Sequence, residues 1–228
     1  MAQLFKNVRH GEAARSGVVV IGLGRFGAAI AKELERCGVE VLAIDNDEAS
    51  VQKVAPHLTH VVRGDGTSEE VLRQLSVPEF STAVVAIGSN LAASILTASV
   101  LLKIGGIEVW AKASSPEQGQ ILTQMGIEHV FYPESDMGRR AAHVVSQSFL
   151  DYIELGYGFA LVATLAPKDL VGQTLGETAL RRAEGITVVA VRDPNGSWET
   201  AHSETFVTEG DTVLVVGPAD KLDRWRVR

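Results

Sequence analysis

The sequence predicts an α/β protein with a doubly wound parallel sheet in its N-terminal part and a smaller α+β lobe after it. Three observations carry this prediction. Apolar strand patterns alternate with helix patterns up to about residue 150, a glycine-rich turn follows the first strand, and short strands dominate afterwards. With 228 residues and 46% hydrophobic side chains, the chain is long enough to bury a proper core.

The expected strands of the parallel sheet are short apolar runs, as in sheets that helices cover on both faces. We place them at 18–22, 40–45, 59–63, 82–87, 107–111 and 128–131. Helices are expected between them, near 25–37, 47–55, 67–75, 89–103 and 116–125. Glycines stand where these helices should end, which is typical of C-terminal caps: Gly38, Gly105, Gly106 and Gly126.

A last helix is expected to begin near Pro133 and to run to about Leu150, as a hinge or crossover into the second lobe. Beyond it the pattern changes to that of a small α+β module. There we expect strands at 158–165, 186–192, 197–201 and 212–216, a helix near 173–183 and a turn at 193–196.

The turn after the first strand, G-L-G-R-F-G at 22–27, carries the chemistry of the first lobe. Gly22 allows the tight turn, Gly24 lets the backbone approach a pyrophosphate, and Gly27 lets the next helix pack close to the sheet. The N–H groups at that helix start face the phosphates, aided by the helix dipole. This turn therefore predicts an adenine nucleotide.

Asp45 strengthens this prediction because it ends the second strand, 18 residues after Gly27. A carboxylate at this place accepts hydrogen bonds from ribose hydroxyls. Asn46 and Asp47 follow it instead of a basic residue, which disfavours a 2′-phosphate and hence NADP. Strand, glycine turn, helix and acid together predict a Rossmann nucleotide-binding unit.

Polar residues also follow the third and fourth strands, at the carboxyl edge where ligands bind in such sheets. Asp65-Gly66-Thr67 either contacts adenine or ribose or caps the next helix, since Thr67 and Glu70 fit the S/T-x-x-E capping box. Ser89 and Asn90 either donate to the nucleotide or cap the helix that follows them.

Three charged residues are the candidates for contacts to phosphate. Arg25 opposes the helix dipole at its own helix start, so a bound phosphate would supply the missing anion; the alternative is a solvated surface arginine. Lys112, at the end of the fifth strand, can neutralise polyphosphate. Glu134 near phosphate suggests Mg²⁺ or another hard cation between them, although it can also simply complement its helix N-terminus.

From residue 18 onward the chain resembles the RCK family, the cytosolic regulators of potassium transport, and specifically its KtrA/TrkA-type subunits. The motifs that carry the resemblance are G-L-G-R-F-G at 22–27, E-V-L-A-I-D at 40–45, G-D-G-T at 64–67, A-I-G-S-N at 86–90, V-W-A-K-A at 109–113 and Y-P-E-S-D-M-G at 132–138.

The resemblance implies a domain layout and a site. It implies an N-terminal arm at 1–17, a Rossmann lobe at 18–137, a crossover helix at 138–152 and a C-terminal lobe at 153–228. Glu134 is the expected metal ligand. The expected nucleotide-binding residues are Gly22, Leu23, Gly24, Arg25, Phe26, Asp45, Asn46, Asp65, Gly66, Thr67, Ile87, Gly88, Ser89, Asn90, Lys112 and Glu134.

The resemblance also implies ligands and partners. ATP or ADP is the expected ligand, with NAD as the alternative, and cyclic di-AMP is a further candidate at the C-terminal lobe, where the stretch 186–190 either lines a dimer groove or is a core strand. Dimers are expected to assemble into a ring, commonly an octamer. The ring would dock on a KtrB/TrkH-type membrane subunit, at the inner face of the cell membrane.

Two other functions remain as alternatives, an NAD-dependent oxidoreductase and an NADH-sensing DNA regulator. No catalytic residue is expected, because the second lobe has a single histidine, His202, and the six histidines show no metal-binding spacing. A net charge of −7 argues against nucleic acid as a partner. The single cysteine and the absence of a signal peptide or a long apolar run suit a cytoplasmic protein.

Overall fold

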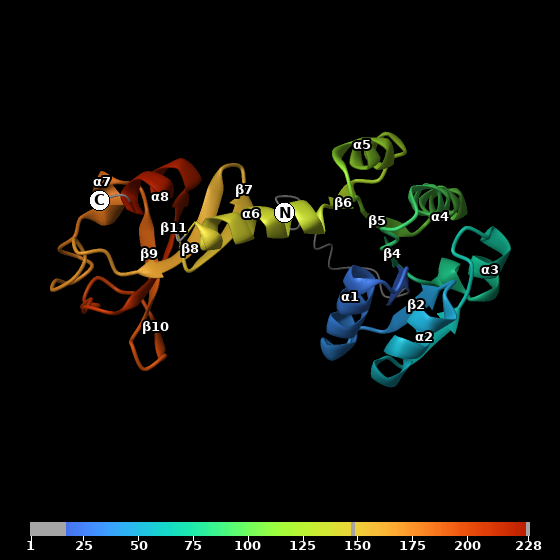
Figure 1. Cartoon of the computed structure of the whole chain (residues 1–228), viewed down its shortest axis with the longest axis horizontal. Coiled ribbons are helices and arrows are strands. Elements are labelled where there is room, and N and C mark those ends of the chain that lie inside the picture. Colours follow the sequence, from blue (N-terminus) through green and yellow to red (C-terminus); the bar gives the residue numbers. More distant parts are fainter. Residues whose placement is uncertain (1–16, 147–148, 227–228) are drawn as a thin grey trace. The chain divides into compact units, whose positions relative to one another are not determined.

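The computed structural model describes residues 17–146 and 149–226. They form two compact units, and the division between them falls between Glu134 and Ser135. Figure 1 shows both units, which are called the N-terminal unit and the C-terminal unit below and are described separately. Among the described residues no helix is long and apolar enough to cross a bilayer.

The N-terminal unit is built on a six-stranded parallel sheet in the order β3-β2-β1-β4-β5-β6. This order changes direction between β1 and β4, as in doubly wound sheets that bind ligands at that point. Every strand expected here is present, so the predicted fold class is confirmed. The strands are β1 Val18–Ile21, β2 Val41–Asp45, β3 His60–Arg63, β4 Thr82–Val85, β5 Glu108–Lys112 and β6 His129–Phe131.

Helices cover both faces of this sheet. Side chains of α1 and α2 pack with Val20 and Ala43 on one face, whereas α3, α4 and α5 pack with Val19 and Ile44 on the other. The helices on these faces are α1 Arg25–Arg36, α2 Glu48–Val54, α3 Glu69–Gln74, α4 Leu91–Ile104 and α5 Pro116–Gln124, with 3₁₀ turns η1 Ala55–His57 and η2 Val77–Glu79. Helix α6 Pro133–Val145 begins at the end of this unit and continues into the C-terminal unit. Consecutive residues of a strand therefore point alternately into two separate cores, one on each face of the sheet.

The helix ends follow local rules with one correction. Asp47, Ser68, Asn90 and Ser115 each accept a hydrogen bond from a backbone N–H in the first turn of their helix. The cap of α3 is thus Ser68 and not Thr67, so the predicted capping box was one residue out of register. The glycines expected to end helices have positive φ, between 71° and 98°: Gly38, Gly105, Gly106 and Gly126.

The C-terminal unit holds an antiparallel five-stranded sheet in the order β10-β9-β11-β8-β7. Its core contains Ile186, Val213, Leu222 and Trp225, all nearly inaccessible to solvent. The elements are β7 Asp151–Gly156, β8 Phe159–Leu165, α7 Leu180–Ala183, β9 Thr187–Arg192, β10 Trp198–Thr200, β11 Thr212–Pro218 and α8 Ala219–Arg226.

Two helix predictions were wrong and two elements of this unit were missed. The helix expected near 173–183 is reduced to α7, because the N–H groups of Leu175 and Gly176 instead donate to the carbonyls of Thr205 and Ser203. The helix expected to reach Leu150 ends at Val145, since the Leu150 N–H donates to Ala163 in β8. Strand β7 and helix α8 were not predicted, because their polar side chains hide the apolar pattern.

Candidate functional site

The glycine turn between β1 and α1 has the geometry that its sequence predicts. Gly22 has φ 97°, and a Cβ there would lie 3.0 Å from the backbone of Ala86. A Cβ on Gly27 would lie 1.9 Å from the Gly22 carbonyl oxygen, so no other residue fits. Gly24 has nothing within 4 Å of such an atom, and it caps α1 without a side-chain hydrogen bond. The α1 N-terminus therefore presents open backbone N–H groups to a ligand.

Asp45 lies beside this turn at the end of β2. Its Oδ2 accepts a hydrogen bond of 2.5 Å from the Leu23 N–H, and its Oδ1 accepts one of 2.8 Å from the Asp47 N–H. The Leu23 side chain is buried in the core, so this residue serves the site through its backbone. Asn46 is exposed next to Asp45. Because each carboxylate oxygen accepts more than one hydrogen bond, Asp45 can hold the turn and still accept from a ribose.

Phe26 and Arg25 occupy the first turn of α1. The Phe26 ring packs edge-on against Phe131, with centroids 5.7 Å apart, so its side chain joins the core. Arg25 is exposed, and its charge helps to lower the pKa of the Glu134 carboxyl group. Of these two side chains, Arg25 is therefore the one that can reach a ligand.

The Asp65-Gly66-Thr67 turn follows β3. Asp65 accepts hydrogen bonds of 2.7 and 2.9 Å from the Thr67 hydroxyl and N–H, and these bonds lower the pKa of the Asp65 carboxyl group. A Cβ on Gly66 would lie 2.5 Å from Ile21 in β1, which brings this turn against the strand that precedes the glycine turn. The Asp65 side chain is exposed at the carboxyl edge of the sheet.

The segment after β4 forms the next wall. Ile87 packs against Gly22, and the Asn90 Oδ1 accepts a 3.0 Å hydrogen bond from the Ala93 N–H, which makes Asn90 the cap of α4. Gly88 and Ser89 are exposed between them. The capping alternative for Asn90 is thus observed, and its amide NH₂ group still faces away from that bond.

Lys112 and Glu134 meet in the structure. The Lys112 Nζ lies 2.6 Å from the Glu134 Oε1, and the lysine side chain is 10% exposed while the glutamate side chain is 60% exposed. The hydrogen bond from Lys112 is the main cause of the lowered pKa of Glu134. The described residues hold no group of three or more His, Cys, Asp or Glu that suits a metal ion. A cation at Glu134 would therefore take its other ligands from phosphate and water.

Gln118 is the site residue that sequence reasoning missed. It is buried in the first turn of α5, and its Nε2 donates to Ser94 Oγ at 3.1 Å and to the Lys112 carbonyl at 3.3 Å. Its Oε1 accepts from the Ser114 N–H at 2.9 Å. The signal was available, because Ser115 and Gln118 fit the S-x-x-Q capping pattern.

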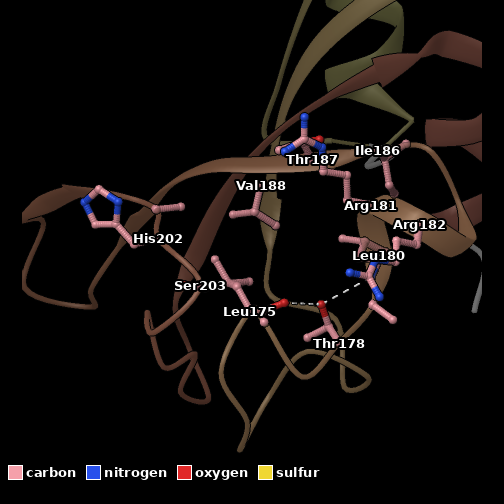
Figure 2. A pocket seen from close by; sticks show the side chains of 13 residues that line it. Leu175, Thr178, Leu180, Arg181, Arg182, Ile186, Thr187, Val188, His202 and Ser203 are labelled. Carbon is pink, nitrogen blue, oxygen red and sulfur yellow. Dashed lines mark hydrogen bonds between the residues drawn. The ribbon is translucent and has the colours of Figure 1, made fainter.

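The C-terminal unit holds a separate pocket of about 470 Å³ (Figure 2). Arg181 and Arg182 come from α7, and apolar atoms come from Ile186 and Val188, in the stretch that was singled out from sequence. The Thr178 hydroxyl donates to the Leu175 carbonyl and shapes one wall. The lining residues are Leu175, Gly176, Thr178, Ala179, Leu180, Arg181, Arg182, Ile186, Thr187, Val188, Ala201, His202 and Ser203.

Comparisons with known proteins agree with both units. The TrkA-N domain family matches residues 18–133, and the TrkA-C domain family matches residues 160–226. Ktr system potassium uptake protein C of Bacillus subtilis is 38% identical over 92% of this chain and 95% of its own length. Ktr system potassium uptake protein A of Vibrio alginolyticus is 35% identical over 89% of this chain and 93% of its own length.

Among solved structures, the GsuK RCK domain matches 94% of this chain with a TM-score of 0.55 and 25% identity. A structure described as the GsuK channel bound to NAD matches 95% of this chain with a TM-score of 0.54 and 25% identity. This chain spans 47% of the first GsuK chain and 40% of the second, which is less than half of each.

Proposed function

Because this chain belongs to the family of potassium uptake proteins that carry a TrkA-N and a TrkA-C domain, we propose that it is a nucleotide-sensing regulatory subunit of a potassium channel or transporter. The two relatives described above carry the names of potassium uptake proteins and not of enzymes, which supports a regulatory role over the oxidoreductase alternative. One observation supports the nucleotide-sensing part: the Asp45 carboxylate, the proposed ribose acceptor, accepts a hydrogen bond from the Leu23 N–H and so lies beside the glycine turn proposed to bind phosphate.

The proposed ligand is ATP or ADP, with NAD as the alternative. The α1 N-terminus and Gly24 would take the first phosphates, and Asp45 would accept from the ribose. The neighbouring turns, at Asp65-Gly66-Thr67 and Ile87 to Asn90, would border the nucleoside. One GsuK structure is described as bound to NAD, so NAD stays the competing ligand here.

A cation is proposed between Glu134 and the terminal phosphate. Glu134 supplies one carboxylate, and phosphate oxygens are the usual companions of a carboxylate around Mg²⁺. Arg25 and Lys112 would balance the remaining phosphate charge. When bound, the cation neutralises charge between Glu134 and phosphate.

The proposed effect of the ligand is a change in quaternary shape. A ligand that contacts Arg25 and Glu134 in one assembly geometry and not in another shifts the equilibrium by its differential affinity. A tenfold preference corresponds to about 1.4 kcal/mol, which suffices when the two shapes are nearly balanced. The assembly would act on a KtrB/TrkH-type membrane subunit from the cytoplasmic face.

Self-association of the N-terminal unit is supported by α4. Leu96 on this helix is 54% exposed, while the opposite side packs Ala98 and Leu101 into the core. A helix that is apolar all round is usually buried on all sides. We therefore assign its exposed side to contacts between copies in the proposed ring, for which an octamer is expected.

A second ligand is proposed for the C-terminal pocket. Two arginines beside apolar Ile186 and Val188 suit a molecule with two phosphates and flat bases, which agrees with cyclic di-AMP. Isothermal titration of the Arg181→Ala and Arg182→Ala variants tests this. Unchanged affinity for cyclic di-AMP in both variants would remove the pocket from the proposal.

Native mass spectrometry of the purified protein, with and without ATP, tests the main proposal. The expected result is a ring-sized assembly that gains the mass of nucleotide on each chain. A protein that stays monomeric and binds neither ATP, ADP nor NAD would contradict the proposed function.

A further inference from the structure

We propose that the Lys112–Glu134 ion pair makes the nucleotide site select polyphosphates that are complexed with a cation. The reason is that the Glu134 carboxylate already occupies the contact with Lys112 that a phosphate without a cation needs. This inference rests on the proposed nucleotide site. It adds that Glu134 opposes cation-free nucleotide in addition to holding a cation.

The Lys112 side chain has little freedom to move. A Cβ at Gly88 would lie 2.8 Å from the Lys112 Nζ, so the loop after β4 closes directly over the ammonium group. The Phe26 ring lies beneath it, with Nζ 5.9 Å from the ring centroid. Lys112 as a whole residue is 8% exposed. The ammonium group is thus held between a backbone loop and an aromatic ring.

The Lys112 main chain is also held. Gln118 binds the Lys112 carbonyl and the N–H of Ser114, and it joins them to Ser94 in α4. All four residues lie in the N-terminal unit. Because these buried groups would lose their hydrogen bonds if the strand end shifted, Lys112 cannot reach out to a ligand. A phosphate has to come to Lys112 where it stands.

Glu134 occupies the contact that such a phosphate would make. The 2.6 Å ion pair neutralises Lys112, and a phosphate arriving beside it would place a second negative charge next to the Glu134 carboxylate. Two outcomes relieve this repulsion. Glu134, which is 60% exposed, turns away, or a cation settles between the carboxylate and the phosphate. The second outcome keeps all charges paired, so ligands complexed with a divalent cation are favoured.

Calorimetry with ATP, in EDTA and in excess Mg²⁺, tests the inference. We expect the Glu134→Gln variant to bind ATP about fivefold more tightly than wild type in EDTA, since a partly exposed charge pair contributes up to about 1 kcal/mol. We also expect Mg²⁺ to improve its ATP affinity less than it does for wild type. Glu117→Gln removes the same charge from the first turn of α5, where the Glu117 carboxylate bonds to Ser115 and not to Lys112, and should leave both affinities at the wild-type level.

Two results would overturn the inference. In the first, Glu134→Gln binds ATP in EDTA no more tightly than wild type. In the second, Glu134→Gln still tightens binding in the Lys112→Met background, which would mean that Glu134 acts by long-range charge and not through Lys112. If wild type binds no adenine nucleotide in EDTA or in Mg²⁺, the proposed function itself has failed. The wild-type titrations therefore distinguish this outcome from failure of the ion-pair inference alone.

Discussion

The Asp45 carboxylate illustrates how one residue combines structural and binding roles. It accepts from the backbone of Leu23 and of Asp47, so it orders both the glycine turn and the start of α2. It is half-buried, which leaves an approach for ribose hydroxyls. Experiments on Asp45 variants must therefore distinguish two effects: the loss of a charged acceptor for the ribose, and the loss of the hydrogen bonds that order the glycine turn.

Asp45→Asn should lower the affinity for adenine nucleotides about tenfold, because hydrogen bonds to a charged acceptor contribute about 1 kcal/mol or more beyond those to a neutral one. Asp45→Ala should lose more, since the Leu23 N–H is then left without its acceptor. Calorimetry measures the affinities and thermal unfolding reports the turn. Wild-type nucleotide affinity in Asp45→Asn would contradict the ribose assignment.

Arg25 should discriminate nucleotides by phosphate number. Arg25→Ala is expected to weaken ATP more than AMP, because only the longer ligand places charge within reach of the guanidinium group. Lys32→Ala removes an exposed cation from the same helix and serves as the control. Equal losses of ATP and AMP affinity would assign Arg25 to the fold or to a subunit contact.

At the scale of elements, local sequence determines helix ends while burial determines which face is used. Four helices of the N-terminal unit begin at a side-chain cap, and α1 begins at Gly24 without one. The exception is the helix assigned to phosphate, whose first N–H groups must stay open for it. Helix α4 follows the rule for helix ends but departs from the rule for helix faces, because its exposed side is as apolar as its buried side.

Leu96→Glu should reduce assembly if α4 lies between copies of the chain. Burying a leucine contributes about 1.5 to 3 kcal/mol, so its replacement by a charge should weaken association at least tenfold. Gln120→Glu, on an exposed position of α5, tests whether any added charge has this effect. Native mass spectrometry showing an unchanged assembly for Leu96→Glu would contradict the assignment.

Helix α6 is tied to the C-terminal sheet by Arg140, whose Nε and Nη2 donate to Asp151 in β7 at 2.7 and 2.6 Å. The hydrogen bonds from Arg140 lower the pKa of Asp151. The pair therefore stabilises the folded unit fully at pH values above the unfolded-state pKa of Asp, near 4. This stabilisation is lost as the pH falls through the lower pKa of Asp151 in the folded state. Arg140→Ala should cost about 1 kcal/mol near pH 7. Denaturant unfolding should show that difference shrinking below about pH 4; a difference independent of pH would contradict it.

At the scale of the whole molecule, two units with separate cores share one chain, and α6 begins at the site and continues into the second unit. The site residue Glu134 lies in the first turn of this helix. A ligand that changes the contacts of Glu134 therefore acts on the element that leads out of the N-terminal unit. This arrangement suits a sensor, because a change at the proposed site can pass along the helix.

Glu134→Gln should separate nucleotide binding from regulation of potassium flux. The side-chain size is kept while the charge that holds a cation is lost, so nucleotide should bind without the divalent-dependent change in assembly. Potassium flux is measured in vesicles that contain the membrane subunit. Wild-type activation of this variant by ATP and Mg²⁺ would remove the cation bridge from the mechanism.

The sequence by itself determined the parallel sheet, the glycine turn, the acid at Asp45 and the glycine helix ends, because each depends on residues close together in the chain. It misplaced the cap of α3 by one residue and predicted a long helix near 173–183. In that segment, pairing with residues 203 to 206 overrides the local pattern. Strand β7 was missed because its polar side chains hide the apolar pattern, and it is held by its pairing with β8.

Only the tertiary structure decided how the site residues meet. Asp45 contacts Leu23, Lys112 contacts Glu134, and Gln118 contacts Ser94, each pair lying 22 to 24 residues apart. These contacts follow from the order in which the strands join, which brings their carboxyl ends to one edge. Sequence motifs predict which residues lie near this edge. Whether a lysine there faces a ligand or a neighbouring carboxylate depends on packing and charge around it, which local sequence does not contain.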